Sequence, residues 1–435
     1  MPAPVRSEPL VRAIGTIGLA AAIINITIGG GIFRLPANVA GSLGAAAPLA
    51  YIVCAIAMGL IVLCIADAGS RVPLTGGPYA YIATAFGGFA GFLSGVLLWM
   101  LGTFAAAAVS TIFASSVGVL VPALSGRVME AVVLAAALAF WGLINARGVT
   151  LGNRLNGVAT VAKLLPLVLL AVAGLFFVRA ENLEWTVTPA ATDIARTSLL
   201  LIFAFAGIEV ALVPSGEVRD TARTVPRAIA LAMFGITVLY ILLQVVSQGI
   251  LGPGLAQATV SPLADAARAS LGGWAGALLL GGASISMFGH MGGMTLSMPR
   301  MVYAFARDGY LPGMFARVAP GSHAPIAAIV LHVVLTFALA TSGTFEKLAI
   351  LANASALALY LGCALASWQL RRAGVAAAGA GFRVPFGAGV PLLACGVIAW
   401  LLTGLTRGEW LAMGVCVAGA SLLYALTASR RQEPS

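Results

Sequence analysis

Charged side chains are scarce in this chain of 435 residues, where Asp, Glu, Lys and Arg together make up 9% of the sequence. Hydrophobic residues make up 60%, and the mean hydropathy is +1.03. A water-soluble protein of this size cannot bury so much apolar surface in its own core. We therefore expect an integral membrane protein that crosses the bilayer several times.

Sequence patterns of enzymes and metal sites are also missing. The sequence has no HExxH, no GxSxG and no P-loop, and no hydrophobic segment holds a cluster of Asp, His or Cys. An intramembrane enzyme would lack its reacting groups, so we expect no catalytic residues, no cofactor and no metal. The five cysteines lack CxxC spacing and are interpreted as packing residues: Cys54, Cys64, Cys363, Cys395 and Cys416.

Hydrophobic segments alternate with short loops along the chain. Twelve segments offer roughly 17 or more apolar residues each, the length that a helix needs to cross the hydrocarbon. They begin near Ile14, Leu43, Tyr81, Val128, Leu155, Thr197, Val225, Gly272, Ala324, Glu346, Gly387 and Glu409. The tails outside them are short, and neither resembles a removable signal peptide.

The basic residues predict the orientation in the membrane. Placing both termini in the cytoplasm puts most of the 24 Lys and Arg residues on the inner side, as the positive-inside rule requires. We therefore expect a multi-pass protein of the cytoplasmic membrane with both termini inside. This topology also accounts for the net charge of +10, so no nucleic-acid partner is expected.

Two glycine breaks interrupt otherwise apolar segments, one at Gly29, Gly30 and Gly31 and the other at Gly207. Four segments lie between the first and the second break, so the two interrupted helices would cross the membrane in opposite senses. An unwound helix at mid-membrane depth is tolerated only where its backbone lines a cavity or holds a solute. The pattern therefore predicts an inverted-repeat transporter, although glycines in membrane helices also serve close packing.

The breaks predict a receptor for a zwitterion. At Gly29, Gly30 and Gly31, free amides at the start of the second half-helix would suit a carboxylate without any charged side chain. In the second break, which we take to begin at Phe203 and extend to Gly207, free carbonyl oxygens would suit an ammonium group.

Four separated motifs resemble those of the amino acid–polyamine–organocation (APC) superfamily of permeases. They are IGGGIF at 28–33, RVPLTGGPYAY at 71–81, FAFAGIE at 203–209 with GEVRD at 216–220 and VPRAI at 225–229, and ARDGYLP at 306–312. The resemblance covers residues 14 to about 370. It implies a ten-helix core of the leucine-transporter type that works by alternating access.

The resemblance also implies roles for single residues. An α-amino acid would lie between spans one and six, with its carboxylate on the amides of the glycine triplet. The carbonyls implied for its amine are those of Ile28, Phe203, Ala204 and Ala206. Phe203 corresponds to an aromatic lid, with Phe205 as a rival.

The expected fold class is an all-α polytopic membrane protein with twelve transmembrane helices. Ten of them would form a 5+5 inverted repeat over residues 14–371, with spans one and six unwound. A cytoplasmic loop at 372–386 and two accessory helices at 387–427 would follow. Cytoplasmic tails would occupy residues 1–13 and 428–435.

Lys163 is one of two charged residues deep within the spans, where a charge costs at least about 2.5 kcal/mol. A desolvated lysine can lose its proton, so Lys163 is a candidate for proton coupling. The resemblance implies that it replaces a sodium ion, which makes transport sodium-independent, with Ser286 on span eight as its neighbour. Alternatively, Lys163 snorkels to the headgroups.

Glu209 is the other charged residue at depth, just after the second break. It could accept a proton, recognise a cationic substrate, or hydrogen-bond the unwound backbone, and the sequence leaves these roles open. His290 and His332 also lie within spans. No metal-ligand spacing surrounds them, so we interpret both as packing residues.

The sequence therefore predicts a secondary-active transporter for an amino acid, with small apolar walls that favour small or medium neutral substrates. It would be a proton symporter or an exchanger of amino acids, and its oligomeric state is left open. The alternative is a polyamine or cationic amino acid carrier, which would want more acids in the cavity than one. A channel would be expected to show rings of carbonyls or charges from repeated segments, and none is apparent.

Overall fold

Helices account for almost all of the regular structure in this chain. A computed structural model describes residues 15–72, 77–147, 164–185, 188–211, 218, 220–320, 322–375, 384 and 387–427. Among these residues the backbone forms α-helices and short 3-10 helices, and no β-strand occurs. The expected all-α class is therefore confirmed.

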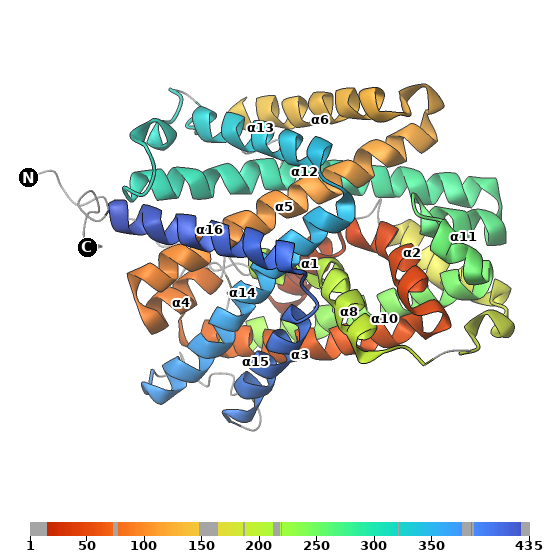
Figure 1. Ribbon diagram of the computed structural model, residues 1–435, viewed down its shortest axis with the longest axis horizontal. Helices are drawn as coiled ribbons and strands as arrows, with labels where there is room; N and C mark the ends of the chain where they lie inside the picture. The colour runs from red at the N-terminus through yellow and green to blue at the C-terminus, as the bar shows by residue number, and fades with distance from the viewer. Residues whose placement is uncertain are drawn as a thin grey trace, which may run out of the picture.

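The labelled α-helices of Figure 1 fall into three groups along the chain. The first group is α1 (Thr16–Thr27), α2 (Gly31–Leu43), α3 (Ala47–Arg71), α4 (Pro78–Phe86), α5 (Gly88–Leu120) and α6 (Arg127–Arg147). The second is α8 (Ala191–Phe205), α9 (Ile208–Ala211), α10 (Thr221–Leu251), α11 (Pro262–Leu271) and α12 (Gly273–Arg307). The third is α13 (Ile326–Ser342), α14 (Phe345–Arg372), α15 (Gly389–Leu402) and α16 (Arg407–Leu426).

Several helical stretches are long and apolar enough to cross a membrane. Six such stretches occur in the described part of the chain: Gly31–Arg71, Gly88–Leu120, Arg127–Arg147, Arg223–Gln257, Phe345–Arg372 and Arg407–Leu426. Three shorter apolar helices accompany them, at Leu164–Phe177, Ile326–Ser342 and Gly389–Leu402. The chain therefore has the build of an integral membrane protein, as its composition predicts.

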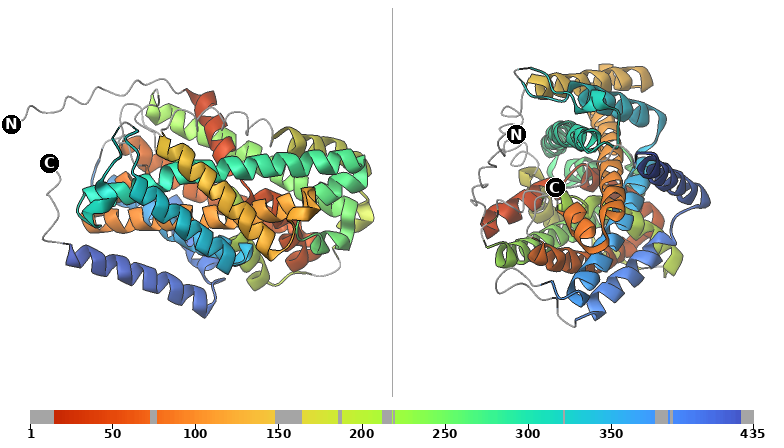
Figure 2. Two further views of the ribbon diagram at one scale, coloured as in Figure 1. Left: turned by 90° about the horizontal axis from the view of Figure 1, so that it is seen from above. Right: turned by 90° about the vertical axis from the view of Figure 1, so that its left-hand side faces the viewer.

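The helices form an elongated bundle in which most axes run along the long direction of the molecule (Figures 1 and 2). At its centre α5 packs against α12 and α14, and α10 packs against α1 and α3. α6 and α13 lie side by side at one edge, and α16 lies on the outside. Only 11% of the apolar window of α16 is buried, so its other side chains face the surroundings of the bundle.

Polar side chains form a seam along α14, in a helix that is otherwise largely apolar. Asn353, Tyr360 and Ser367 follow one another at intervals of seven residues, which puts them on one face of the helix. The Asn353 amide donates to the carbonyl of Leu199 in α8 at 2.7 Å, and the Tyr360 hydroxyl donates to Glu209 in α9 at 2.7 Å. Ser367 reaches α3, so the seam ties α14 to three other helices.

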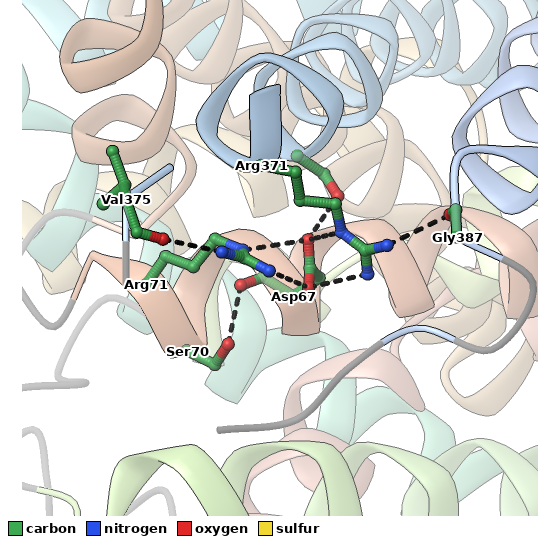
Figure 3. Close-up of polar contacts among 7 residues, drawn as sticks. Asp67, Ser70, Arg71, Arg371, Val375 and Gly387 are labelled. Carbon is green, nitrogen blue, oxygen red and sulfur yellow. Dashed lines mark hydrogen bonds and ion pairs between the residues drawn. The ribbon is translucent and has the colours of Figure 1, made fainter. Parts of the chain in front are cut away.

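The seam ends in a buried charge cluster around Asp67 of α3 (Figure 3). The Arg371 guanidinium donates to both Asp67 oxygens, at 2.8 and 2.9 Å, and the Ser367 hydroxyl donates at 2.7 Å. Arg71 donates to the same carboxylate from one turn along α3, at 3.4 Å. Both arginines also donate to backbone carbonyls, those of Val375 and Gly387, so the cluster joins α3, α14 and the start of α15.

We predict that Asp67→Ala destabilises the fold by about 3 kcal/mol, because it leaves two partly buried guanidinium groups without their carboxylate. Thermal unfolding of the purified protein in detergent measures this effect. Asp308→Ala is the matched control, since its ion pair with Arg307 is exposed and such pairs contribute little. Equal unfolding temperatures for the two variants would contradict the prediction.

Candidate functional site

The first break is a short non-helical stretch between α1 and α2. α1 ends at Thr27 and α2 begins at Gly31, and the Gly29 amide turns back to donate to the Thr27 carbonyl at 2.7 Å. A Cβ on Gly31 would lie 2.8 Å from Cδ1 of Phe203, and one on Gly30 would lie 3.1 Å from Val109. Glycine is therefore required at Gly31, where the chain passes directly against a neighbouring ring.

The second break lies between α8 and α9. α8 ends at Phe205, Ala206 is extended with ψ of 153°, and α9 begins at Ile208. Gly207 between them has φ of +125°, a conformation that only glycine adopts without strain. A Cβ there would also lie 3.3 Å from the carbonyl oxygen of Ile26 in α1.

The two interruptions lie next to each other and the helices cross in opposite directions. Gly31, after the first break, lies against Ala204, before the second. Gly207, after the second break, lies against Ile26, before the first. Accordingly α2 packs on α8, and α1 packs on α9. The backbone of both breaks therefore meets at one place inside the bundle.

A small cavity occupies this place. It offers about 40 Å³ to the centres of water molecules, room for about three of them. Its lining residues from the two broken helices are Ile26, Thr27, Gly29, Gly30, Gly31, Phe203, Ala206, Gly207 and Glu209. α5 and α12 complete the lining with Leu98, Leu101, Gly102, Ala105, Val109, His290 and Met294. The walls are thus largely apolar, and the polar groups come mainly from unwound backbone.

Glu209 is buried at the second break and is held on both sides. Its Oε1 accepts from the Gly207 amide at 2.9 Å, and its Oε2 accepts from the Tyr360 hydroxyl at 2.7 Å. Only 1% of the residue is exposed. The carboxylate therefore satisfies a backbone amide that the break leaves without a helical partner, and it links the break to α14.

Aromatic and charged side chains cover the cavity where α2 and α14 meet. The Phe203 ring packs edge-on against Phe345 at the start of α14, with ring centroids 5.5 Å apart. The Arg34 guanidinium lies over the Phe345 ring and is 3.9 Å from Glu346. These four side chains join α2, α8 and α14 above the cavity.

Comparison with known proteins identifies the family. The amino acid permease family matches residues 14–373 of this chain. The chain belongs to the amino acid permease family. The predicted resemblance to the APC superfamily is thereby confirmed, because this family is part of it.

Relatives of this permease include other transporters. It is 27% identical to a methylthioribose transporter of Bacillus subtilis (strain 168), over 97% of this chain and 94% of that protein. It is 31% identical to an uncharacterized transporter of Mycobacterium tuberculosis (strain ATCC 25618 / H37Rv), over 81% of this chain and 82% of that protein. The permease is therefore a membrane transporter.

Five of the eight residues predicted to bind substrate line the cavity: Gly29, Gly30, Gly31, Phe203 and Ala206. The other three, Ile28, Ala204 and Phe205, are buried beside it. The Phe205 ring packs edge-on against Tyr240, whereas Phe203 faces the cavity, so Phe203 is the aromatic side chain at this site.

Two of the residues predicted for proton coupling lie apart from the cavity lining. Lys163 is outside the described residues. Ser286 is buried in α12, and its hydroxyl finds no hydrogen-bond partner in the described part of the chain. The expected contact between the two is therefore not among the contacts that the structure describes.

The sequence interpretation missed three side chains at the site. His290, interpreted as a packing residue, lines the cavity. The Tyr240 hydroxyl donates to the Ala204 carbonyl at 2.9 Å and to the Thr27 carbonyl at 3.4 Å, and Tyr360 holds Glu209. A tyrosine in an apolar helix carries no signal that distinguishes such a role from packing. His332 is buried away from the cavity, beside Thr336.

We predict that Gly207→Ala destabilises the permease by about 1 to 3 kcal/mol, because alanine would be strained at φ of +125° and would press on Ile26. Gly29→Ala is the control, since a Cβ there meets nothing closer than 3.8 Å. Thermal unfolding in detergent compares the two. The prediction is wrong if Gly207→Ala unfolds at the temperature of the unmodified protein.

Proposed function

We propose that this permease is a secondary-active transporter that carries a zwitterionic amino acid bound between its two helix breaks. One observation carries the proposal: the unwound backbone of both breaks lines a single cavity. The lining described by the structure contains one acid and no Lys or Arg, so backbone dipoles are the main groups available for a charged ligand.

The carboxylate would bind at the start of α2. No backbone acceptor lies within hydrogen-bonding distance of the Gly30 and Gly31 amides among the described residues. Both amides belong to the N-terminal end of a helix, where the dipole favours an anion. The glycines also let a ligand approach the backbone closely.

The ammonium group would bind at the C-terminal end of α8. The last turn of a helix leaves carbonyl oxygens without helical partners, and here these include the carbonyl of Phe203. The Ala204 carbonyl already accepts from Tyr240, so the carbonyls of Ile28, Phe203 and Ala206 are the better candidates. The small volume and the apolar walls formed by Leu101 and Val109 favour a short, uncharged side chain.

The architecture that goes with this function is a pair of inverted repeats within twelve spans, with both termini in the cytoplasm. The antiparallel crossing of the broken helices supports it, because an inverted repeat brings equivalent helices together in opposite directions. In this arrangement the contacts among Arg34, Phe203, Phe345 and Glu346 close the outward side of the cavity in an alternating-access cycle.

Glu209 is the group that we propose for proton coupling, together with Lys163. Both Glu209 oxygens act as acceptors in this structure. A proton on one oxygen turns that oxygen into a donor, so the carboxyl group no longer accepts fully from both Gly207 and Tyr360. Protonation would thereby loosen a contact between the second break and either α9 or α14.

Two other ligand classes compete with a neutral amino acid. A polyamine or cationic amino acid would use Glu209, but both of its oxygens already have donors. The relative from Bacillus subtilis is a methylthioribose transporter, and an uncharged ligand of this kind would suit the apolar walls. It would leave the charge preference of the two helix ends unused.

A binding screen on the purified permease tests the substrate class. We expect small neutral amino acids to raise the unfolding temperature, since a ligand at 100 times its Kd stabilises by about 2.7 kcal/mol. The matching amines without a carboxylate, spermidine and methylthioribose should give no shift. Stabilisation by methylthioribose or spermidine, with none by any amino acid, would overturn the proposed substrate.

We predict that Glu209→Gln abolishes uptake driven by a pH gradient in proteoliposomes, because glutamine cannot gain or lose a proton. Exchange of internal for external amino acid should continue, since the amide can still accept from Gly207 or Tyr360. Lys163→Ala is the parallel variant for the second coupling candidate. If Glu209→Gln keeps the full pH dependence, the carboxylate serves the backbone of the break alone.

A further inference from the structure

His290 lies on the side of the cavity formed by α12, close to the glycine triplet of the first break. It belongs to the cavity lining, and a Cβ built on Gly29 would lie 3.8 Å from its Nδ1. Met294, one turn further along α12, also lines the cavity and is apolar. The imidazole is therefore the polar side chain that α12 brings to the end of the cavity where α2 begins.

The chemistry of the other polar side chains in the lining leaves His290 a distinct role. These side chains are Thr27 and Glu209. An ionised Glu209 only accepts hydrogen bonds and would repel a second carboxylate. Thr27 belongs to α1, on the other side of the break from the α2 amides. The imidazole carries an N–H donor in either tautomer, and it lies beside those amides.

A carboxylate at the start of α2 has more acceptor capacity than the glycine amides can fill. Its two oxygens offer about four lone-pair sites. The Gly30 and Gly31 amides point out of the helix end and approach the ligand from one direction, so the opposite side of the carboxylate would otherwise face apolar walls. A buried charge with unfilled acceptor sites is costly.

We propose that His290 donates a hydrogen bond to the carboxylate of the substrate and completes an anion site together with the amides of Gly30 and Gly31. This inference rests on the proposed amino acid function and deepens it. The carboxylate would then be held from two helices, α2 and α12. His290 thereby makes the permease selective for ligands that carry a carboxylate over otherwise identical amines.

Binding of matched ligands to matched variants tests this role. The ligands are an amino acid that stabilises the unmodified permease, its methyl ester, and the corresponding amine without a carboxylate. The variants are His290→Leu, which removes the donor, and His290→Gln, which keeps an N–H donor. Met294→Leu is the control on the same helix and in the same cavity. Calorimetry on the purified, full-length protein gives each Kd.

We expect His290→Leu to raise the Kd of the amino acid about ten- to hundredfold, as for loss of a hydrogen bond to a charged group. The Kd values of the ester and the amine should change far less, so the selectivity for the carboxylate falls. His290→Gln should keep most of the selectivity. Met294→Leu should change the Kd of all three ligands by the same factor.

Other outcomes separate the failure of this role from the failure of the proposed function. Equal losses for the amino acid and the amine in His290→Leu would show that His290 packs against the ligand, and would overturn the inference alone. An unmodified permease that binds no amino acid would overturn the proposed function as well. If His290→Leu does not yield folded protein, His290→Met fills the same space without a donor and takes its place.

Discussion

The unwinding of two buried helices at one point is the constraint on which the rest of this structure depends. Each break exposes amides and carbonyls that water cannot reach in a membrane, and each group left without a partner costs free energy. Neighbouring side chains answer part of this need. Tyr240 donates to carbonyls of both broken helices, and Glu209 accepts from the Gly207 amide. The amides of Gly30 and Gly31 lack such partners in the described chain and are left for a solute.

The polar seam of α14 connects this site to the far end of the bundle. Asn353 holds α8 before the break, Tyr360 holds Glu209 after it, and Ser367 with Arg371 holds Asp67 of α3. These bonds are directional, so α14 cannot rotate or slide against the broken helix without losing several of them at once. A change in the protonation of Glu209 would therefore be felt along α14 and, through it, at α3.

How much of this could be predicted from the sequence depends on whether the signal was local. The triple glycine and the acid at Glu209 stand out within their own segments, and both lie at the cavity. Tyr360 and Asp67 could not be assigned because their partners lie 151 and 304 residues away, and a single sequence contains no information on such pairs. His290 was misread for a related reason, since its role depends on a glycine in another helix.

The relative that transports methylthioribose bears on where specificity resides in this fold. Backbone amides can donate to a sugar hydroxyl as well as to a carboxylate, so the glycine triplet alone does not demand a charged ligand. The dipole of α2 favours an anion, and a nearby imidazole strengthens that preference because it adds a donor without adding a fixed charge. Discrimination between a zwitterion and a neutral sugar would then depend on the few side chains around the breaks. Apolar walls such as Leu101 and Val109 would set only the size of the ligand.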